Sequence, residues 1–278
     1  MASSKAPLGV FDSGLGGISV LREIRQVLPR ESILYYADNA WCPYGLRPPD
    51  EIRERSRLIT GHLISQGAKA VVVACNTASA MAITDLRAAF PTTPIIGLEP
   101  AVKPAVARTR SGRVGVLATP RTVSGERLRW LIETHAEGVT VHTVAAPGLV
   151  ELVEAGNLQG PDVRTALQPL LDPMLEANVD VIVLGCTHYP FLRRAITDYV
   201  GPGVSIIDSG AAIANRARWV LTEAGLLQPF AEGWTSSLEF QTSASVEDVA
   251  PVVELLLGEA ASVTHQDVEV PAVTTIRQ

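Results

Sequence analysis

Two segments of this chain are near copies of each other, and each places a cysteine at the same point. Residues 70–77 contain Cys75, and residues 181–188 contain Cys186. Each segment begins as a continuous apolar run, which is typical of a parallel strand buried on both faces of a sheet. Ligands of open α/β sheets bind at the carboxyl ends of the strands. The duplication therefore predicts two sheets that each deliver one thiol to a shared substrate, as a paired acid and base.

Apolar runs of strand length alternate with helix-length stretches along most of the chain. This alternation indicates an α/β protein with parallel sheets. The expected strands are residues 8–11, 33–37, 70–74, 94–97, 113–117, 139–144, 179–184 and 204–207. The expected helices are residues 51–66, 77–89, 163–177 and 211–224, and a last helix that ends near Leu257 and opens with the capping-box pair Ser245 and Asp248.

The internal repeat extends beyond the two cysteines. Residues 9–13 resemble residues 115–119 at an offset of 106, and the cysteines are offset by 111. The isoleucine pairs at 95–96 and 206–207 share the offset of 111. One nearly constant shift thus maps the first hundred residues onto the second hundred.

We therefore predict two pseudo-symmetric, doubly wound parallel-sheet domains with the active site in the cleft between them. The first domain comprises residues 1–97 and 208–278, because the segment after Ile207 is expected to return to it. The second domain comprises residues 98–207. Beyond Gly258 the apolar period is lost, which predicts a loosely ordered tail.

Composition excludes several classes of protein. Hydrophobic residues make up 47% and charged residues 19% of the chain, which favours buried cores over disorder. A net charge of −6 without a basic cluster argues against nucleic acid as a partner. No apolar run approaches the ~20 residues that span a bilayer, and too few residues precede the first strand for a signal peptide, so no membrane partner is expected. Three scattered cysteines suit a reducing cytoplasm better than a disulfide framework.

The two repeated cysteines admit more than one reading. A single cysteine after a buried strand is more often a small core residue, but the symmetric pair favours acid–base chemistry. A helix that begins directly after Cys75 and after Cys186 would favour the thiolates and lower the thiol pKa. Asp12 is placed to assist proton transfer at the first thiol, and His188 at the second. The competing reading is a metal site made of both cysteines, Cys42 and His188; Cys-Thr-His is not a zinc-binding spacing, so no metal is predicted.

The loop after the first strand, residues 12–17, is rich in glycine. It is not a dinucleotide fingerprint, since Ser19 stands where the last glycine belongs, and no P-loop lysine follows. A carboxylate is also the wrong charge beside a phosphate, so we interpret Asp12 as a base or as a group that orients another. The counterpart of this loop in the second half carries Thr119 and Thr122, whose hydroxyls suit a substrate carboxylate.

Two further segments are ambiguous from the sequence. Residues 41–45 form a Pro/Gly turn in which Tyr44 either closes over a substrate or packs as a structural tyrosine. Cys42 has no counterpart in the repeat and is interpreted as incidental. Glu151 and Glu154 share one face of a short helix, for which a solvated surface pair is the default reading.

With these pieces in place, the chain resembles the glutamate racemases, the cofactor-independent amino-acid racemases of bacterial cell-wall synthesis. The similarity runs from about Pro7 to Leu257. The motifs that carry it are Phe-Asp-Ser-Gly-Leu-Gly-Gly at 11–17, Pro-Tyr-Gly at 43–45, Ala-Cys-Asn-Thr-Ala-Ser at 74–79 and Gly-Cys-Thr-His-Tyr-Pro at 185–190.

The resemblance implies a two-base mechanism without a cofactor, which supplies D-glutamate for peptidoglycan, and a homodimer. It implies that Cys75 deprotonates D-glutamate with the help of Asp12, and that Cys186 deprotonates L-glutamate with the help of His188. Glu154 matches the glutamate of the family motif Val-x-Leu-Val-Glu-x-Gly. The implied substrate contacts are Asp12, Ser13, Pro43, Tyr44, Gly45, Asn76, Thr77, Thr119, Thr122, Thr187 and His188.

Two other functions stay open at this stage. One is a racemase of another acidic amino acid, such as aspartate, which the wider superfamily includes. The other is a non-catalytic, two-domain protein that clamps a small anion; it would keep its affinity in Cys75→Ser and Cys186→Ser variants. Glu151, which stands where the family commonly has proline, has no interpretation.

Overall fold

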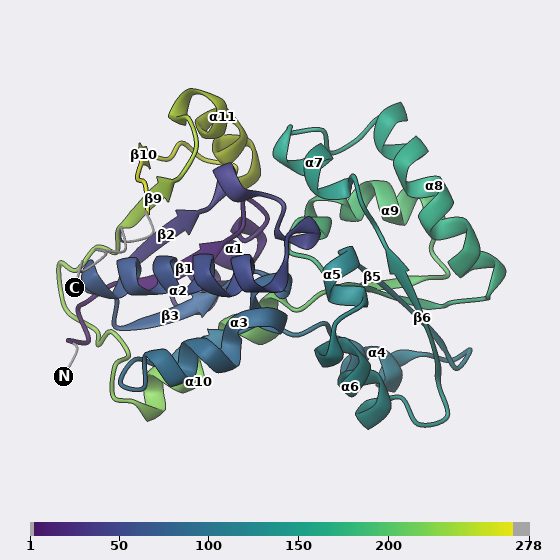
Figure 1. Ribbon diagram of the computed structural model, residues 1–278, viewed down its shortest axis with the longest axis horizontal. Coiled ribbons are helices and arrows are strands. Elements are labelled where there is room, and N and C mark those ends of the chain that lie inside the picture. Colours follow the sequence, from purple (N-terminus) through teal and green to yellow (C-terminus); the bar gives the residue numbers. More distant parts are fainter. Residues whose placement is uncertain (1–2, 269–278) are drawn as a thin grey trace, which may run out of the picture.

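The structure, a computed structural model, describes residues 3–268, in which ten strands form two sheets. The strands are β1 (Leu8–Asp12), β2 (Ile33–Ala37), β3 (Ala70–Val73), β4 (Ile95–Gly97), β5 (Arg113–Ala118), β6 (Thr140–Ala145), β7 (Val181–Leu184), β8 (Ser205–Ile207), β9 (Leu238–Thr242) and β10 (Val263–His265). The first sheet has the order β10-β9-β2-β1-β3-β4 and the second β6-β5-β7-β8. All strand pairs between the described residues are parallel, so the predicted α/β class with two parallel sheets is confirmed. Figure 1 shows two lobes, the second built from the middle of the chain.

The sequence repeat is visible in the topology. The order β2-β1-β3-β4 in the first sheet matches β6-β5-β7-β8 in the second. The registers also correspond, since Phe11 pairs with Val73 and Leu117 pairs with Leu184. These two pairs are related by the offsets of 106 and 111 that relate the sequences. The two cysteines therefore follow equivalent strands, Cys75 after β3 and Cys186 after β7.

Helices cover both faces of each sheet (Figure 1). They are α1 (Ile18–Val27), α2 (Pro49–Ser65), α3 (Asn76–Ala89), α4 (Val102–Arg108), α5 (Pro120–Val123), α6 (Glu126–His135), α7 (Leu149–Glu154), α8 (Pro161–Glu176), α9 (Arg193–Val200), α10 (Gly210–Glu223) and α11 (Val246–Leu257), with the 3₁₀ turns η1 (Asn39–Trp41), η2 (Tyr44–Leu46) and η3 (Tyr189–Leu192). Helix α1 packs against α10 and α11, and α2 packs against α3. Ser245 precedes α11 as expected, but its side chain makes no capping hydrogen bond, so the capping-box interpretation is wrong.

The hydrophobic core joins the two lobes. One cluster of buried side chains continues from the first sheet into the second and includes Leu15, Leu98, Leu117 and Cys186. Two further clusters fill the remaining layers, one under α2 and α3 and one under α4 and α6. Because burial of apolar surface stabilises both lobes through shared side chains, the cleft between them has a defined geometry.

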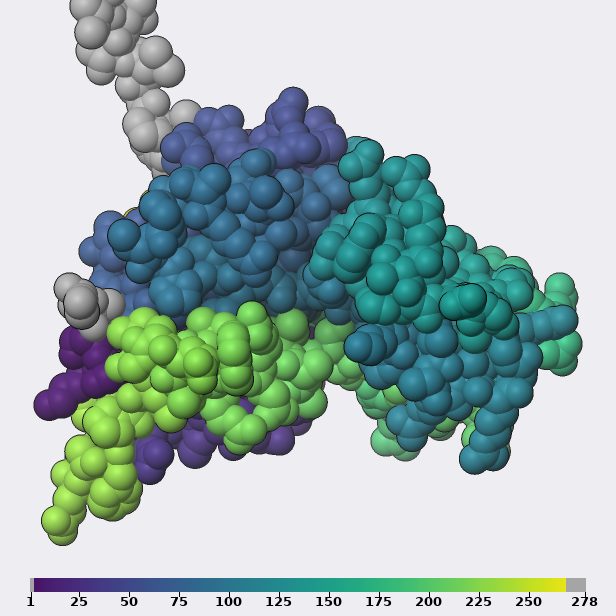
Figure 2. Space-filling view, turned by 90° about the horizontal axis from the view of Figure 1, so that it is seen from below, coloured from purple at the N-terminus to yellow at the C-terminus, as the bar shows by residue number. Residues whose placement is uncertain are grey.

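The chain passes into the second lobe after β4 and returns after β8. After the return, α10 packs on α1 and β9 pairs with β2, and Figure 2 shows the α10 segment in green against the first lobe. We propose residues 1–97 with 208–278, and residues 98–207, as the two domains. The tail expected beyond Gly258 is wrong in part, because β10 pairs with β9 there; residues 269–278 lie outside the described part. Within residues 3–268, every helix is too short or too polar to cross a bilayer.

Candidate active site

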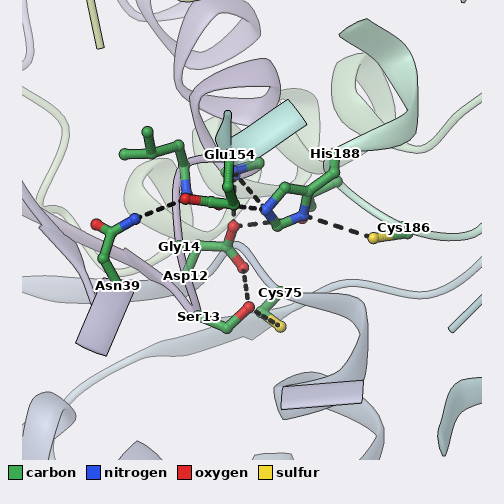
Figure 3. A network of polar contacts seen from close by, with 12 residues as sticks. Asp12, Ser13, Gly14, Asn39, Cys75, Glu154, Cys186 and His188 are labelled. Atoms are coloured by element: carbon green, nitrogen blue, oxygen red, sulfur yellow. Dashed lines mark hydrogen bonds and ion pairs between the residues drawn. The ribbon is translucent and has the colours of Figure 1, made fainter. Parts of the chain in front are cut away.

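Three polar groups meet where β1 and β3 end. Cys75 caps the N-terminus of α3, and the Ala78 amide donates a hydrogen bond to its sulfur at 3.4 Å. The Cys75 thiol lies 3.6 Å from the Ser13 Oγ, and that hydroxyl lies 3.4 Å from the Asp12 Oδ1 (Figure 3). Asp12 is fully buried and accepts a hydrogen bond of 2.6 Å from the Gly17 amide. Thiol, hydroxyl and carboxylate thus form a chain that can carry a proton away from Cys75.

A second chain of contacts leads away from Cys186, at the end of β7. Its sulfur lies 3.6 Å from the Nδ1 of His188, and the Nε2 of that ring lies 2.6 Å from the Glu154 Oε1. Glu154 is held in turn by the Leu15 amide and by the Asn39 side-chain amide, each at 2.7 Å. Figure 3 shows the two sulfurs at different ends of one network of polar contacts. The reading of Glu154 as a solvated surface residue is therefore wrong, whereas Glu151 is exposed.

The local backbone after the two cysteines differs. An α-helix starts directly after Cys75, as expected. After Cys186 the chain turns first, then forms the 3₁₀ segment η3 from Tyr189, and only then α9 from Arg193. The expectation of a helix directly after each cysteine is thus wrong for Cys186. Its sulfur contacts the His188 ring, whereas the Cys75 sulfur contacts a helix amide.

The pKa of His188 differs from its ordinary value because of the groups around it. Burial lowers the pKa of His188, but its contacts with Cys186, Cys42 and Glu154 raise that pKa more, to well above its ordinary value. The raised pKa favours the imidazolium form of His188, which pairs with the Glu154 carboxylate. This charge sits within reach of the Cys186 sulfur.

At the first thiol, burial dominates. Burial raises the pKa of Cys75 well above its ordinary value, and the nearby carboxylate of Asp12 adds to this effect. The Ala78 amide lowers the same pKa by less, so the prediction of a lowered thiol pKa is wrong for Cys75 in this structure. Burial also raises the pKa of Asp12, although His188 and the Gly17 amide oppose it. Cys75 rests as a thiol.

The predicted substrate hydroxyls come together across the two lobes. The Thr119 Oγ1 lies 3.0 Å from both the Thr77 Oγ1 and the Thr122 Oγ1. The Thr187 hydroxyl donates to the Asp12 Oδ2 at 3.4 Å. Asn76 follows Cys75, and its buried side-chain nitrogen makes no hydrogen bond to another described group. These groups offer donors for a substrate with carboxylate groups.

The Pro-Tyr-Gly turn packs against the same hydroxyl cluster. A side chain at Gly45 would bring its Cβ within 2.7 Å of Thr119, so only glycine lets the turn approach this closely. The Tyr44 hydroxyl donates to the Asp38 Oδ2 at 2.5 Å, and Arg55 binds the same carboxylate. That hydroxyl is therefore engaged in the first lobe, which favours the structural reading of the tyrosine. Pro43 lies beside Cys42 at the wall of a cavity next to Glu154.

Sequence reasoning misses Asn39 and Thr242 at the site and gives Cys42 no role in the reaction. Asn39 binds Glu154, and the Thr242 hydroxyl donates to the Asn39 Oδ1 at 3.0 Å. Cys42, interpreted as incidental, lies with His188 and Glu154 in a group whose ligand atoms are all within 4.8 Å of one another. The metal site considered from the sequence does not form as a unit, because Cys75 and Cys186 lie outside this group. The available signal was that Cys42 directly precedes the Pro-Tyr-Gly motif.

The site is closed in this structure. Cys75 is 4% exposed and Cys186 is 6% exposed. The cavity beside Asn76, Cys186 and Thr187 measures about 10 Å³, which is too small for an amino acid and barely admits one water molecule. The site must therefore open before an amino acid can bind there. Closure then excludes water and strengthens each polar contact.

Comparisons with known proteins agree on one family. Residues 9–217 match the Asp/Glu/hydantoin racemase family. The glutamate racemase of Ectopseudomonas mendocina is 50% identical over 265 residues, which cover 95% of this chain and 99% of that protein. The glutamate racemase of Escherichia coli in complex with L-glutamate and the activator UDP-MurNAc-ala superposes with a TM-score of 0.82 at 34% identity, over 95% of this chain and 99% of that one. The glutamate racemase of Francisella tularensis in complex with D-glutamate superposes with a TM-score of 0.83 at 27% identity. The match covers 96% of this chain and 99% of that one.

Proposed function

The chain belongs to the Asp/Glu/hydantoin racemase family, and from this premise we propose that it interconverts L- and D-glutamate through two cysteines that act on opposite faces of the α-carbon. The observation that carries the proposal is that two buried thiols each have a separate proton-handling partner. Relatives that bear the name glutamate racemase favour glutamate as the substrate over aspartate.

The reaction exchanges one proton for another on the substrate. In the direction from L to D, the Cys186 thiolate removes the α-proton and becomes a thiol, and the electron pair moves into the substrate carboxylate. The Cys75 thiol then donates its proton to the opposite face and becomes a thiolate. In the reverse direction the two residues exchange roles, and Ser13 and Asp12 handle the proton of Cys75.

The neighbours of the two sulfurs suit attack on L-glutamate. Cys75 rests as a thiol, ready to donate, because burial raises its pKa. A thiolate that forms at Cys186 lies against the positive imidazolium of His188. Glu154 holds that ring in place from the other side.

The chain's own donors meet the charge that develops on the substrate carboxylate. The hydroxyls of Thr77, Thr119, Thr122 and Thr187 and the free amide nitrogen of Asn76 are candidates for this role. Preorganised donors in a dry cleft stabilise such charge more strongly than water does. The mechanism therefore needs no cofactor.

Three finer points rest on the family and on the cysteines. We propose that the product D-glutamate enters peptidoglycan synthesis, that the protein acts in the cytoplasm and that it forms a homodimer. The three cysteines are free thiols, which suits a reducing compartment.

The test uses purified protein and each enantiomer of glutamate in heavy water, with chelator and without added cofactor. We expect the α-hydrogen NMR signal to disappear from both enantiomers while circular dichroism decays to zero. Exchange and racemisation of aspartate instead would replace the substrate. If both amino acids bind but neither exchanges, the protein is an anion-binding protein and the proposal fails.

A further inference from the structure

Cys42, which has no part in the proposed reaction, lies beside the contact between Glu154 and His188. Its sulfur, a carboxylate oxygen of Glu154 and a ring nitrogen of His188 all lie within 4.8 Å of one another. Tetrahedral Zn²⁺ binds sulfur at about 2.3 Å and nitrogen or oxygen at about 2.0–2.2 Å, which places its ligands roughly 3–4 Å apart. Small side-chain shifts bring the three atoms to that spacing.

Two backbone amides contact these atoms: the Leu15 amide donates to the Glu154 Oε1 at 2.7 Å, and the Gly16 amide donates to the His188 Nε2 at 3.2 Å, so a bound ion replaces these contacts. A Cβ on Gly14 would lie 2.2 Å from the Glu154 Oε1 and 2.8 Å from the Cys42 Sγ. A Cβ on Gly16 would lie 2.2 Å from the His188 Nδ1. Gly14 thus leaves the space in which the Cys42 thiol and the Glu154 carboxylate meet, and Gly16 lets the backbone approach the His188 ring.

A cavity leads to the group from outside the closed cleft. It measures about 390 Å³, and Cys42, Pro43 and Glu154 form part of its wall. Glu151 and Asp248 line the same cavity and add negative charge that attracts a cation. A metal ion can therefore reach Cys42 without passing between the two catalytic sulfurs.

We propose that Cys42, Glu154 and His188 form an inhibitory site for a borderline-soft divalent cation of the zinc class. Thiolate, imidazole and carboxylate are the donor set that Zn²⁺ prefers, and a water molecule completes the tetrahedron. On binding, the Cys42 thiol and the His188 imidazolium each release a proton to solvent, and the metal replaces the hydrogen bond between His188 and Glu154. The ion takes the Nε2 that contacts Glu154, whereas the Nδ1 still faces Cys186. A metal-bound imidazole cannot also be an imidazolium, so the ion removes the positive charge beside Cys186 and impairs proton transfer on that side.

The inhibition rests on the proposed racemase function, whereas the binding does not, and the test separates the two. Metal-free protein is titrated with Co²⁺, which reports a thiolate ligand through an intense near-ultraviolet charge-transfer band. Racemisation of L-glutamate is then measured against free Zn²⁺ concentration and again after addition of chelator. The variants are Cys42→Ser and Cys42→Ala, compared with Cys75→Ser and Cys186→Ser for the binding arm only.

We expect one Co²⁺ per chain with a thiolate band in the wild type, Cys75→Ser and Cys186→Ser, and no band in either Cys42 variant. Zn²⁺ should inhibit the wild type reversibly, and each Cys42 variant should need at least about tenfold more Zn²⁺ for half-inhibition. A band that survives in the Cys42 variants but disappears in Cys186→Ser overturns the proposal, as does the absence of both band and inhibition. If metal-free protein lacks racemase activity but the band depends on Cys42, the site stands and the proposed function fails. Circular dichroism of both Cys42 variants identifies one that fails to fold.

Discussion

Cys75 and Cys186 occupy equivalent places in a repeat, yet they have different neighbours. Cys75 caps an α-helix and contacts a hydroxyl and a carboxylate, Ser13 and Asp12, from its own lobe. Cys186 is followed by a 3₁₀ turn and contacts the charged ring of His188. The repeat accounts for where the sulfurs lie, but the groups that handle their protons differ. The comparison teaches that equal positions in a duplicated fold need not have equal protonation.

The polar contacts that lead away from Cys75 and from Cys186 also differ in which lobes they include. The chain from Cys75 lies in the first lobe. The chain from Cys186 passes through Glu154 in the second lobe and ends on Asn39 and Thr242 in the first. The Cys75 group meets the second lobe through one contact, the Thr187 hydroxyl on Asp12, whereas the Cys186 group crosses between the lobes at Glu154 and Asn39.

Replacing one of the two cysteines at a time should have the largest effect on activity and should distinguish their roles. We expect Cys75→Ser and Cys186→Ser each to lower racemisation by about 10²–10⁴-fold, because a hydroxyl is a far weaker acid than a thiol. In heavy water, Cys75→Ser should still exchange the α-hydrogen of L-glutamate, and Cys186→Ser that of D-glutamate, as NMR would show. Exchange of the opposite enantiomers would reverse the assignment of the two faces.

Loss of the carboxylate behind His188 should weaken one side alone. We expect Glu154→Gln to lower kcat by about ten- to a hundredfold, because the neutral amide no longer stabilises the imidazolium. The primary isotope effect with α-deuterated substrate should rise from L to D and fall from D to L. The matched control, Glu151→Gln, changes an exposed carboxylate one turn away and should behave like the wild type. Equal changes in both isotope effects would contradict the separation of the two chains.

The outer end of that chain should matter less. Asn39→Ala removes one of two amide donors to Glu154, so we expect kcat to fall about two- to fivefold with KM nearly unchanged. Asn39→Asp places a second carboxylate beside Glu154 and should lower kcat further. Thr242→Val, one contact farther out, should have the smallest effect. If Asn39→Asp is as active as the wild type, the amide does not position Glu154.

The residues directly before β3 and β7, Lys69 and Asp180, also differ in the contacts that stabilise the fold. Lys69 makes a buried ion pair with Glu31 before β3. Its equivalent before β7, Asp180, accepts hydrogen bonds from Thr109 and from the amides of Arg110 and Ser111.

Partial burial raises the pKa of Asp180, but the hydrogen bonds lower it to about 2, against about 3.9 in the unfolded chain. A lowered pKa stabilises the fold above pH 4, and this contribution is lost as the pH falls towards 2. We expect Asp180→Asn to lower the free energy of unfolding by about 1 kcal/mol at pH 6, allowing for solvent exposure, and by about half as much at pH 3. Urea unfolding at both pH values measures the gap. A constant gap would mean that the carboxylate charge plays no part.

Much of the fold follows from local sequence. Apolar runs such as Val181–Leu184 predict buried strands, and the offset of 111 residues predicts the matching sheet order. Strands β9 and β10 escape prediction because Leu238–Thr242 mixes polar and apolar residues and Val263–His265 is short and largely exposed. Strand β9 also pairs with β2, which lies far away in the sequence.

The candidate site divides in the same way. Motifs and symmetry mark Cys75, Cys186 and Asp12, because each follows a buried strand at its carboxyl end. Asn39 and Cys42 join the site only through contacts with residues more than a hundred positions away, and no local pattern encodes such contacts. The raised pKa of Cys75 likewise depends on burial by both lobes, which a sequence pattern of helix and strand does not report.

The path of the chain has a consequence for how the protein is made. The strands of the second sheet come from one continuous stretch, residues 113–207, whereas the first sheet takes its last two strands from residues 238–265. During synthesis from the N-terminus, the second lobe can complete its sheet while the first still lacks an edge. Thr242, which orients Asn39 beneath Glu154, is added later still. The newborn chain therefore holds both sulfurs before the first sheet has its last two strands, and full activity should appear only once residues 238–265 have been made and have joined that sheet.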